Sequence, residues 1–152
     1  KSLGLYASYY AVTGATDFDD RIVEGIAEYK LDKDSSVVLD IFKNFRPDVT
    51  DKTLGYLVEG KTQLMGAFKG SLAYGSLQAN AIDQTAVFSD SDFATLLGVN
   101  NNQGFKATLG WSPFKDNDLS LAVFMTSNID TAGSAAAIGN QTVILADWVV
   151  KI

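Results

Sequence analysis

The chain has 152 residues, a formal net charge of −6 and a hydrophobic share of 47 %, and it contains neither cysteine nor histidine. This length suits one domain with a sizeable core. The surplus of acids disfavours nucleic acid and anionic membrane surfaces as partners. Without cysteine there are no disulfides or thiolate metal sites, and without histidine the commonest general base and metal ligand is missing. No apolar run reaches the roughly 18 residues that a spanning helix needs.

Sequence signatures of common enzymes are also missing. The chain contains no G-x-x-x-x-G-K-S/T phosphate-binding loop, no G-x-S-x-G nucleophile turn and no H-E-x-x-H zinc motif. An enzyme would need an acid-only mechanism, and no carboxylate pair stands out for one. We therefore predict that the protein is not an enzyme and that it has no cofactor.

Strand-like runs with turn residues between them recur along the chain, whereas good amphipathic helix signals are absent. Both prolines, Pro47 and Pro113, lie between such runs, where a missing N–H does no harm. The predicted strands cover, in chain order, residues 2–12, 21–31, 36–45, 53–61, 66–80, 103–112, 118–128 and 141–152. The sequence thus predicts one all-β antiparallel domain over residues 1–152.

The connections between the predicted strands alternate in length. Tight turns are expected at 31–36, 60–66 and 112–118, and the longer links are 12–20, 45–52, 81–102 and 128–140. Outer-membrane barrels have short turns at one end and long loops at the other, and the last predicted strand runs toward the short-turn end. This layout favours an antiparallel transmembrane β-barrel with about eight strands in this chain.

The two faces of the strands support the same interpretation. In the last strand an uncharged face (Ile144, Ala146, Trp148, Val150, Ile152) alternates with one that carries an acid and a base (Val143, Leu145, Asp147, Val149, Lys151). A membrane barrel turns its apolar face to lipid and its polar face to the lumen, the reverse of a soluble barrel. Lys43 and Gln78 fall on apolar faces, near the long-loop end. Aromatic residues near strand ends suit interfacial girdles: Tyr9, Tyr29, Phe68, Phe105, Trp111 and Trp148.

Charged residues on the opposite faces are the candidate lining of a lumen. They are Glu24, Glu28, Lys30, Asp40, Glu59, Lys61, Lys69, Lys106, Asp147 and Lys151. Acids and bases are balanced in this set, which predicts a mixed lining with modest charge preference. The alternative is that these groups pair across neighbouring strands and fill a closed lumen, because eight strands alone enclose a filled interior and about 16 leave an aqueous channel.

The longest predicted loop, 81–102, combines acids with aromatic residues. Asp83, Asp90 and Asp92 lie close to Phe88 and Phe93 in sequence. One interpretation is a constriction loop that folds inward and attracts cations through its carboxylates. The other is a solvated acidic surface loop. No D-x-D-x-D-G pattern is present, so we predict no metal site.

From about residue 53 onward the chain resembles the C-terminal region of the bacterial putative-porin family. The matching elements are Asn80-Ala81, Phe88-Ser89-Asp90-Ser91-Asp92-Phe93, Asn100-Asn101-Asn102, Gly104-Phe105-Lys106 and the closing ILADWVVKI. The resemblance implies a β-barrel porin in the outer membrane of Gram-negative bacteria. Such a diffusion channel contacts outer-membrane lipids and lets small hydrophilic solutes or ions pass through its lumen.

Members of that family are expected to be longer than this chain, so the resemblance also implies that these strands are the closing part of a larger barrel. A homo-oligomer stays open as an alternative. Two other functions are consistent with the pattern. One is a non-conducting eight-stranded barrel that anchors or interacts. The other is a soluble β-barrel or sandwich that binds an apolar ligand, which would invert every face assigned above.

Overall fold

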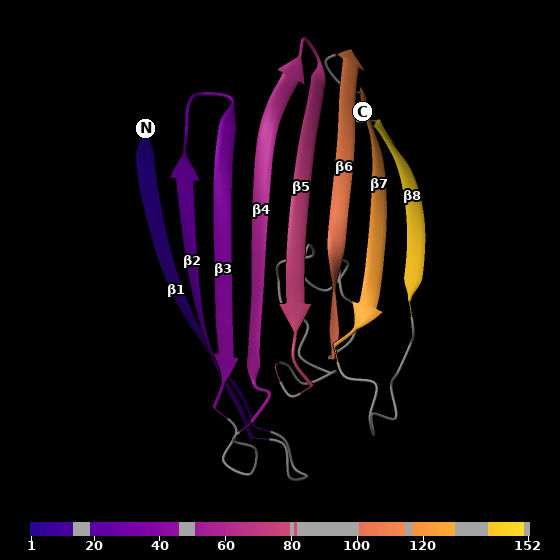
Figure 1. Cartoon of the computed structure of the whole chain (residues 1–152). Coiled ribbons are helices and arrows are strands. Elements are labelled where there is room, and N and C mark those ends of the chain that lie inside the picture. Colours follow the sequence, from indigo (N-terminus) through magenta and orange to yellow (C-terminus); the bar gives the residue numbers. More distant parts are fainter. Residues whose placement is uncertain are drawn as a thin grey trace.

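The computed structural model describes residues 1–13, 19–45, 51–79, 81, 101–114, 117–129 and 140–150. They form one antiparallel sheet in which each strand pairs with its neighbours in chain order. The strands are β1 (Ser2–Thr13), β2 (Asp19–Lys30), β3 (Ser35–Asn44), β4 (Leu54–Met65), β5 (Phe68–Leu77), β6 (Asn102–Phe114), β7 (Asn117–Asn128) and β8 (Gln141–Val150) (Figure 1). The prediction of an all-β antiparallel fold with eight strands is confirmed.

No helix within the described ranges has both the length and the apolar character needed to cross a membrane.

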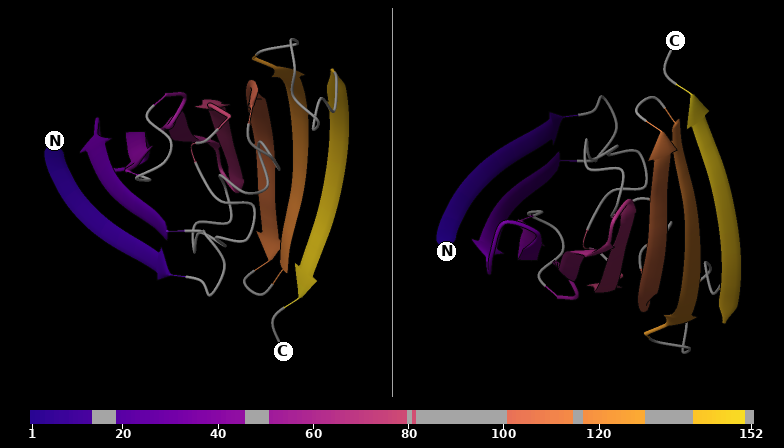
Figure 2. Two further views of the ribbon diagram at one scale, coloured as in Figure 1. Left: turned by 90° about the horizontal axis from the view of Figure 1, so that it is seen from below. Right: turned by 90° about the horizontal axis from the view of Figure 1, so that it is seen from above.

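The sheet is curved and open. Figure 2 shows the strands following an arc, with β1 and β8 at its two ends. In the described part of the chain these two strands do not pair with each other, so the predicted barrel is not closed. β1 and β8 therefore each have a single strand neighbour.

One predicted turn lies at a different position. The sequence placed a turn at 60–66, but β4 continues to Met65. Gly60 pairs with Val37 and Leu72 inside the sheet. The chain reverses instead at Gly66, whose φ of 57° lies in the left-handed region that glycine enters without a Cβ clash. A register shift between Gln63 and Met65 accompanies this turn.

The turn end of the sheet is staggered. Lys30, the last residue of β2, lies in one row of cross-strand partners with Ser36, Lys61, Ser71 and Thr108. Beyond that row β4 still extends to Met65, and β6 extends further, to Phe114. Successive hairpins thus reach progressively farther along the strand direction. A stagger of this kind is what a sheet needs in order to coil into a barrel.

A small buried cluster lies on one face of the sheet, mainly in its long-loop half. Its members are Ile22, Phe42, Leu57, Ala73, Leu77, Ala81 and Phe124, with Tyr10 and Ala122 packed against it. Phe42 lies opposite Gly55 in the sheet, and a Cβ added to Gly55 would overlap the Phe42 ring. The missing side chain of Gly55 is therefore what makes room for this aromatic ring.

Candidate functional site: a charged concave face and an apolar convex face

The register of the sheet places the candidate lumen residues together. Partners directly opposite each other in an antiparallel sheet point to the same face. Following these pairs from β2 to β8 gathers nine of the ten residues on one face: Glu24, Glu28, Lys30, Asp40, Glu59, Lys61, Lys69, Lys106 and Asp147. Lys151 lies outside the described residues, and so do Asp83, Asp90 and Asp92 of the predicted constriction loop.

The charged face is the concave one. Side chains on the inside of a curved sheet crowd one another, whereas those on the outside splay apart. Glu24, Asp40 and Glu59 are only 6 %, 3 % and 6 % exposed. Charged residues are almost never buried to this degree unless they are paired. The concave face thus buries carboxylates beside the apolar cluster of Phe42 and Leu57.

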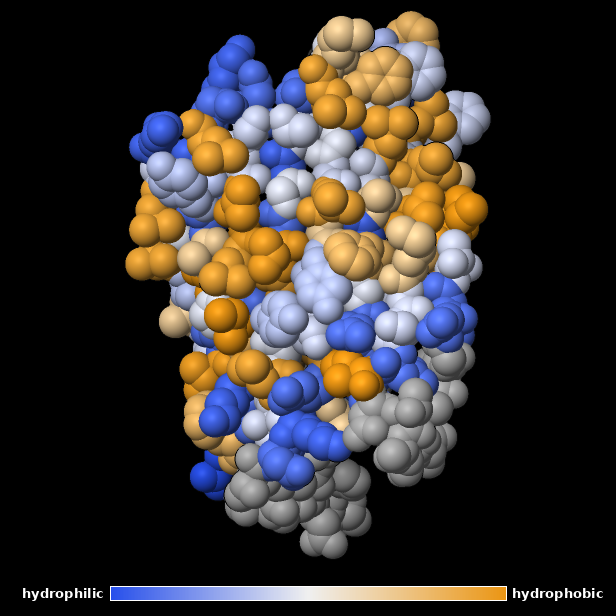
Figure 3. Space-filling model, viewed as in Figure 1, coloured by the Kyte–Doolittle hydropathy of each residue, from blue (hydrophilic) through white to orange (hydrophobic). Residues whose placement is uncertain are grey.

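The convex face is apolar and exposed. Its large hydrophobic residues include Leu5, Leu39, Leu72, Ile144 and Trp148, which are 38 % to 70 % exposed. Figure 3 views the sheet from this side and shows hydrophobic side chains spread over the strands. Residues of this kind occur from β1 (Leu5) to β8 (Trp148). Large contiguous apolar patches are rare on soluble monomers and mark interaction or membrane surfaces.

Five aromatic residues of the convex face lie at two levels along the strands, whereas Tyr29 lies between these levels, in the row of Leu72. Toward the short turns, Phe68 stacks on Trp111 with ring centroids 5.7 Å apart, and the register places Trp148 in the same row. Farther along the strands, Tyr74 lies 4.7 Å from Phe105 between ring centroids. Two aromatic levels on an apolar surface match the girdles at the two interfaces of a membrane barrel.

Lys43 and Gln78 are the two polar residues that the sequence analysis assigned to apolar faces. Both lie toward the long loops, as predicted. Lys43 has its Nζ 5.2 Å from the centroid of the Phe45 ring, a cation–π arrangement that accommodates a charge beside apolar residues. Gln78 accepts a hydrogen bond from the backbone N–H of Leu54 through its side-chain oxygen, at 3.0 Å.

Acids and bases in strands β2 to β6 of the concave face are largely separated along the strands, which the sequence did not reveal, whereas Asp147 of β8 lies in the row of Lys69. Starting from the long-loop end, successive rows carry Glu24, then Asp40, then Glu28 with Glu59. The bases follow: Lys106 in the same row as Glu59, then Lys30 and Lys61, then Lys69. We call the first group the acidic layer (Glu24, Glu28, Asp40, Glu59) and the second the basic layer (Lys30, Lys61, Lys69, Lys106).

A tyrosine that the sequence analysis did not single out supports the acidic layer. The Tyr10 hydroxyl donates a hydrogen bond to Glu24 Oε2 at 3.1 Å. Hydrogen bonding to a carboxylate offsets part of the cost of removing its charge from water. Tyr10 belongs to β1, in the row next to that of Glu24 and on the same face, so the period-two pattern of the first strand could have identified it.

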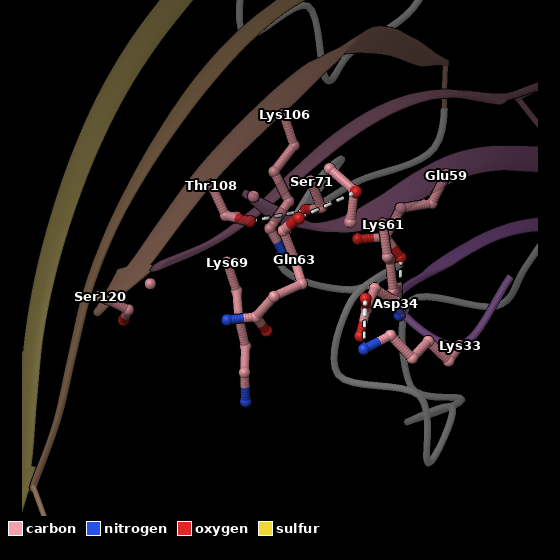
Figure 4. A pocket seen from close by; sticks show the side chains of 13 residues that line it. Lys33, Asp34, Glu59, Lys61, Gln63, Lys69, Ser71, Lys106, Thr108 and Ser120 are labelled. Carbon is pink, nitrogen blue, oxygen red and sulfur yellow. Dashed lines mark hydrogen bonds and ion pairs between the residues drawn. The ribbon is translucent and has the colours of Figure 1, made fainter. Parts of the chain in front are cut away.

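Three residues of the basic layer, Lys61, Lys69 and Lys106, line a hollow of about 520 Å³ on the concave face (Figure 4). Lys61 Nζ lies 2.9 Å from Glu59 Oε2, and Lys106 Nζ lies 5.5 Å from the centroid of the Phe124 ring. The hydroxyls of Ser71 and Thr108 are 2.6 Å apart. Neither hydroxyl residue was a predicted site residue, although each follows a candidate lysine by two positions and therefore shares its face.

The turn between β2 and β3 is ordered by an aspartate. The backbone N–H of Asp34 donates to Asp32 Oδ1 at 2.8 Å, and this hydrogen bond holds the pKa of the Asp32 carboxyl below its usual value of 3.8. Lys33 and Asp34 of this turn form an ion pair at 3.5 Å and also line the hollow. The tight turn thus adds both a cation and an anion to the rim of the hollow.

The two edge strands depart from this two-sided pattern: β8 is exposed on both faces, and Tyr6 on the concave side of β1 is 60 % exposed. Val143 and Leu145 lie on the concave side and are each 42 % exposed. An edge strand has a neighbour on one side only, so its side chains have fewer contacts.

No protein-family model matches this chain, and neither the curated proteins nor the solved structures contain a match to it. The resemblance to a porin family therefore stays a prediction from the sequence, and the functional argument depends on the geometry of the two faces.

Proposed function

We propose that this chain forms part of the wall of an outer-membrane β-barrel porin through which small hydrophilic solutes diffuse. The observation that carries the proposal is the inverted polarity of the curved sheet. Its concave face holds the charged side chains, three of them carboxylates with at most 6 % exposure, and its convex face exposes the large apolar side chains. A surrounding bilayer and a water-filled lumen would satisfy both faces.

The exposed apolar side chains of the convex face explain why a membrane location would be energetically favourable. Burying an exposed leucine-sized side chain is worth about 1.5–3 kcal/mol. Leu3, Leu5, Tyr9, Leu72 and Trp148 are each at least 60 % exposed, so most of this gain is still available to a surrounding apolar phase. A soluble barrel that binds an apolar ligand would need the opposite arrangement, with these residues inside.

Strand length agrees with a membrane location. The strands contain 10 to 13 residues, and a tilted transmembrane strand needs about 9–11. The stagger of successive hairpins also suits tilted strands in a barrel wall.

The edges of the sheet at β1 and β8 imply that a channel would need further strands. Each unsatisfied backbone group costs several kcal/mol in a bilayer, so open sheet edges do not occur there. Our proposal therefore includes pairing of β1 and β8 with further strands, supplied by more chain or by other copies. Additional strands also widen the barrel, because about 16 strands enclose an aqueous channel whereas eight are filled by side chains.

Single-channel recording tests this function. The detergent-folded protein would be inserted into a planar bilayer in symmetric salt, and insertion would be verified by protection from added protease. We expect stable stepwise conductance with a reversal potential in a salt gradient that reports charge preference. Inserted protein without conductance would contradict a channel built from copies of this chain alone and favour a non-conducting anchor, leaving the porin function to a longer chain. Protein that stays soluble without detergent would contradict the membrane assignment.

A further inference from the structure

We propose that an apolar groove on the convex face, across strands β1 to β3, holds an acyl chain of an anionic phospholipid whose phosphate is bound by Arg21 and Lys43. The groove has a volume of about 540 Å³. This inference goes beyond the porin proposal: it rests on the membrane location in that proposal but not on conduction.

Small side chains form the floor of the groove. Ala7 and Gly25 are cross-strand partners, and Ala27 lies two residues farther along β2. Nothing lies within 4 Å of a Cβ added to Gly25, so the surface is open at this position. Larger apolar side chains on β1 and β3 border the floor: Leu5, Leu39 and Ile41. A flexible hydrocarbon chain can therefore approach the backbone here and contact atoms on both sides.

Two cationic side chains lie at the long-loop end of the groove. Lys43 is the cross-strand partner of Val23, and Arg21 lies two residues before Val23 on the same face. Both cationic residues are exposed. Diagonal neighbours of this kind are about 7–8 Å apart, within reach of long side chains. Arginine and lysine are both common phosphate binders, so the two side chains can converge on one phosphate.

The charge at this end of the groove complements an anion. Among the convex-face side chains that the structure describes at the long-loop end of β1 to β3, the charged ones are Arg21 and Lys43. Glu24 also borders the groove, but its side chain belongs to the concave face and accepts a hydrogen bond from Tyr10 there. The net charge of −6 is a property of the whole chain and does not describe this face.

The position of the cations along the strands suits a lipid headgroup. Lys43 lies four residues beyond Leu39, which corresponds to about 13 Å. Tyr9, in the row of Lys43, is 63 % exposed, and the Phe45 ring lies 5.2 Å from Lys43 Nζ. Basic and aromatic side chains are typical of the interface between a bilayer and water. The groove thus leads from such an interface toward the middle of the apolar face.

A second copy of this chain fits the groove less well than a lipid does. Its convex face could supply apolar contacts, but the described strand residues on that face include no carboxylate to pair with Arg21 and Lys43. A phospholipid supplies both the apolar chain and the anion. The charge complementarity therefore favours the lipid.

Native mass spectrometry of the full chain in nonionic detergent micelles tests the site without requiring conduction. Phosphatidylglycerol, phosphatidylcholine with the same acyl chains, and glycerol 3-phosphate would be titrated separately. We expect saturable binding of phosphatidylglycerol that is at least about fivefold tighter than binding of phosphatidylcholine. Equal affinities for the two lipids would overturn the role of the cations. Binding of glycerol 3-phosphate as tight as that of the lipid would overturn the role of the groove.

Charge variants test the headgroup contact. A basic residue near an anionic lipid surface is worth about fivefold in affinity, so Arg21→Gln/Lys43→Gln should weaken phosphatidylglycerol binding roughly 25-fold. Lys30→Gln/Lys69→Gln removes two charges from the concave face and is the matched control, with an expected change below about twofold. Equal losses in the two double variants would overturn the proposal.

Groove variants test the acyl-chain contact independently. Gly25→Leu places a side chain in the groove and should weaken phosphatidylglycerol binding about tenfold, the equivalent of about two methylene groups excluded from contact. Gly60→Leu is the matched control, because Gly60 also lies on the convex face, has no atom closer than 4.0 Å to an added Cβ and does not line the groove. Its effect should stay below about twofold. Unchanged affinity in Gly25→Leu, or lipid-free dimers that only this variant disrupts, would overturn the lipid site.

Comparison with the bilayer recording separates this inference from the porin proposal. Conducting channels whose affinity for phosphatidylglycerol does not depend on Arg21, Lys43 or Gly25 would refute the lipid site and leave the porin proposal intact. Specific lipid binding by an inserted but silent protein would support the lipid site and leave the porin function to a longer chain.

Discussion

Substitution of arginine for Leu72 tests directly whether the convex face meets lipid. Leu72 lies in the middle of β5, is 60 % exposed and has Gly60 and Ala107 as its cross-strand partners. These small neighbours leave room for a long side chain, so the variant should not clash. Its effect on stability then depends mainly on the medium outside the sheet.

The expected magnitudes differ clearly between water and lipid. About two fifths of the Leu72 side chain is buried by folding, so in water its replacement should cost no more than about 1 kcal/mol. An arginine near the midplane of a bilayer costs about 2–4 kcal/mol on the lipid face of a barrel, falling to about 0–1 kcal/mol near the interfaces. Met65 is 79 % exposed beside the turn between β4 and β5, and Met65→Arg is therefore the depth control.

Equilibrium unfolding by guanidinium in phospholipid vesicles would measure both variants, with fluorescence of the two tryptophans as the signal. We expect Leu72→Arg to lower the free energy of unfolding by about 2–4 kcal/mol and Met65→Arg by at most about 1 kcal/mol. If both variants lose less than about 1 kcal/mol, the convex face does not face hydrocarbon and the reasoning is refuted.

Two further predictions concern packing on the concave face and use the same unfolding measurement. Gly55→Ala should lower the free energy of unfolding by about 1–3 kcal/mol, because its new Cβ would overlap the buried Phe42 ring. The control Gly25→Ala should be nearly neutral, since nothing lies within 4 Å of the added atom. Equal losses in the two variants would contradict this packing. Tyr10→Phe should cost about 1–3 kcal/mol by removing the hydrogen bond to the buried Glu24 carboxylate, and unchanged stability would show that this bond contributes nothing.

Much of the sheet could be predicted from the sequence, because the side chains of a strand alternate between its two faces and the residue types alternate with them. Alternation in the segment around Glu24 and Glu28 was enough to place both residues on one face, and the structure agrees. Turn residues between apolar runs located the strands to within a few positions. These signals are local, so a single sequence is sufficient for them.

What could not be predicted depends on cross-strand register. The sequence contains two glycines near the reversal between β4 and β5, and only pairing with neighbours shows that Gly60 stays in the sheet and Gly66 makes the turn. The contact of Tyr10 with Glu24 likewise joins strands whose relative shift the sequence does not state. Closure of the sheet depends on whether the edge strands β1 and β8 pair with each other, and no local sequence pattern predicts that pairing.

The register also changes how the balance of acids and bases in the candidate lining should be interpreted. Counted as a set, the concave charges nearly cancel, and this balance predicted modest selectivity. Ordered along the strands, however, Glu24 and Asp40 lie toward the long loops and Lys61 and Lys69 toward the turns. Glu24 and Lys69 lie several rows apart, a separation that exceeds the Debye length of about 8 Å, whereas Glu59 and Lys61 at the boundary between the layers are 2.9 Å apart. The charge preference of a channel with this wall would therefore depend on which rows line its narrowest point, and not only on the sum of its charges.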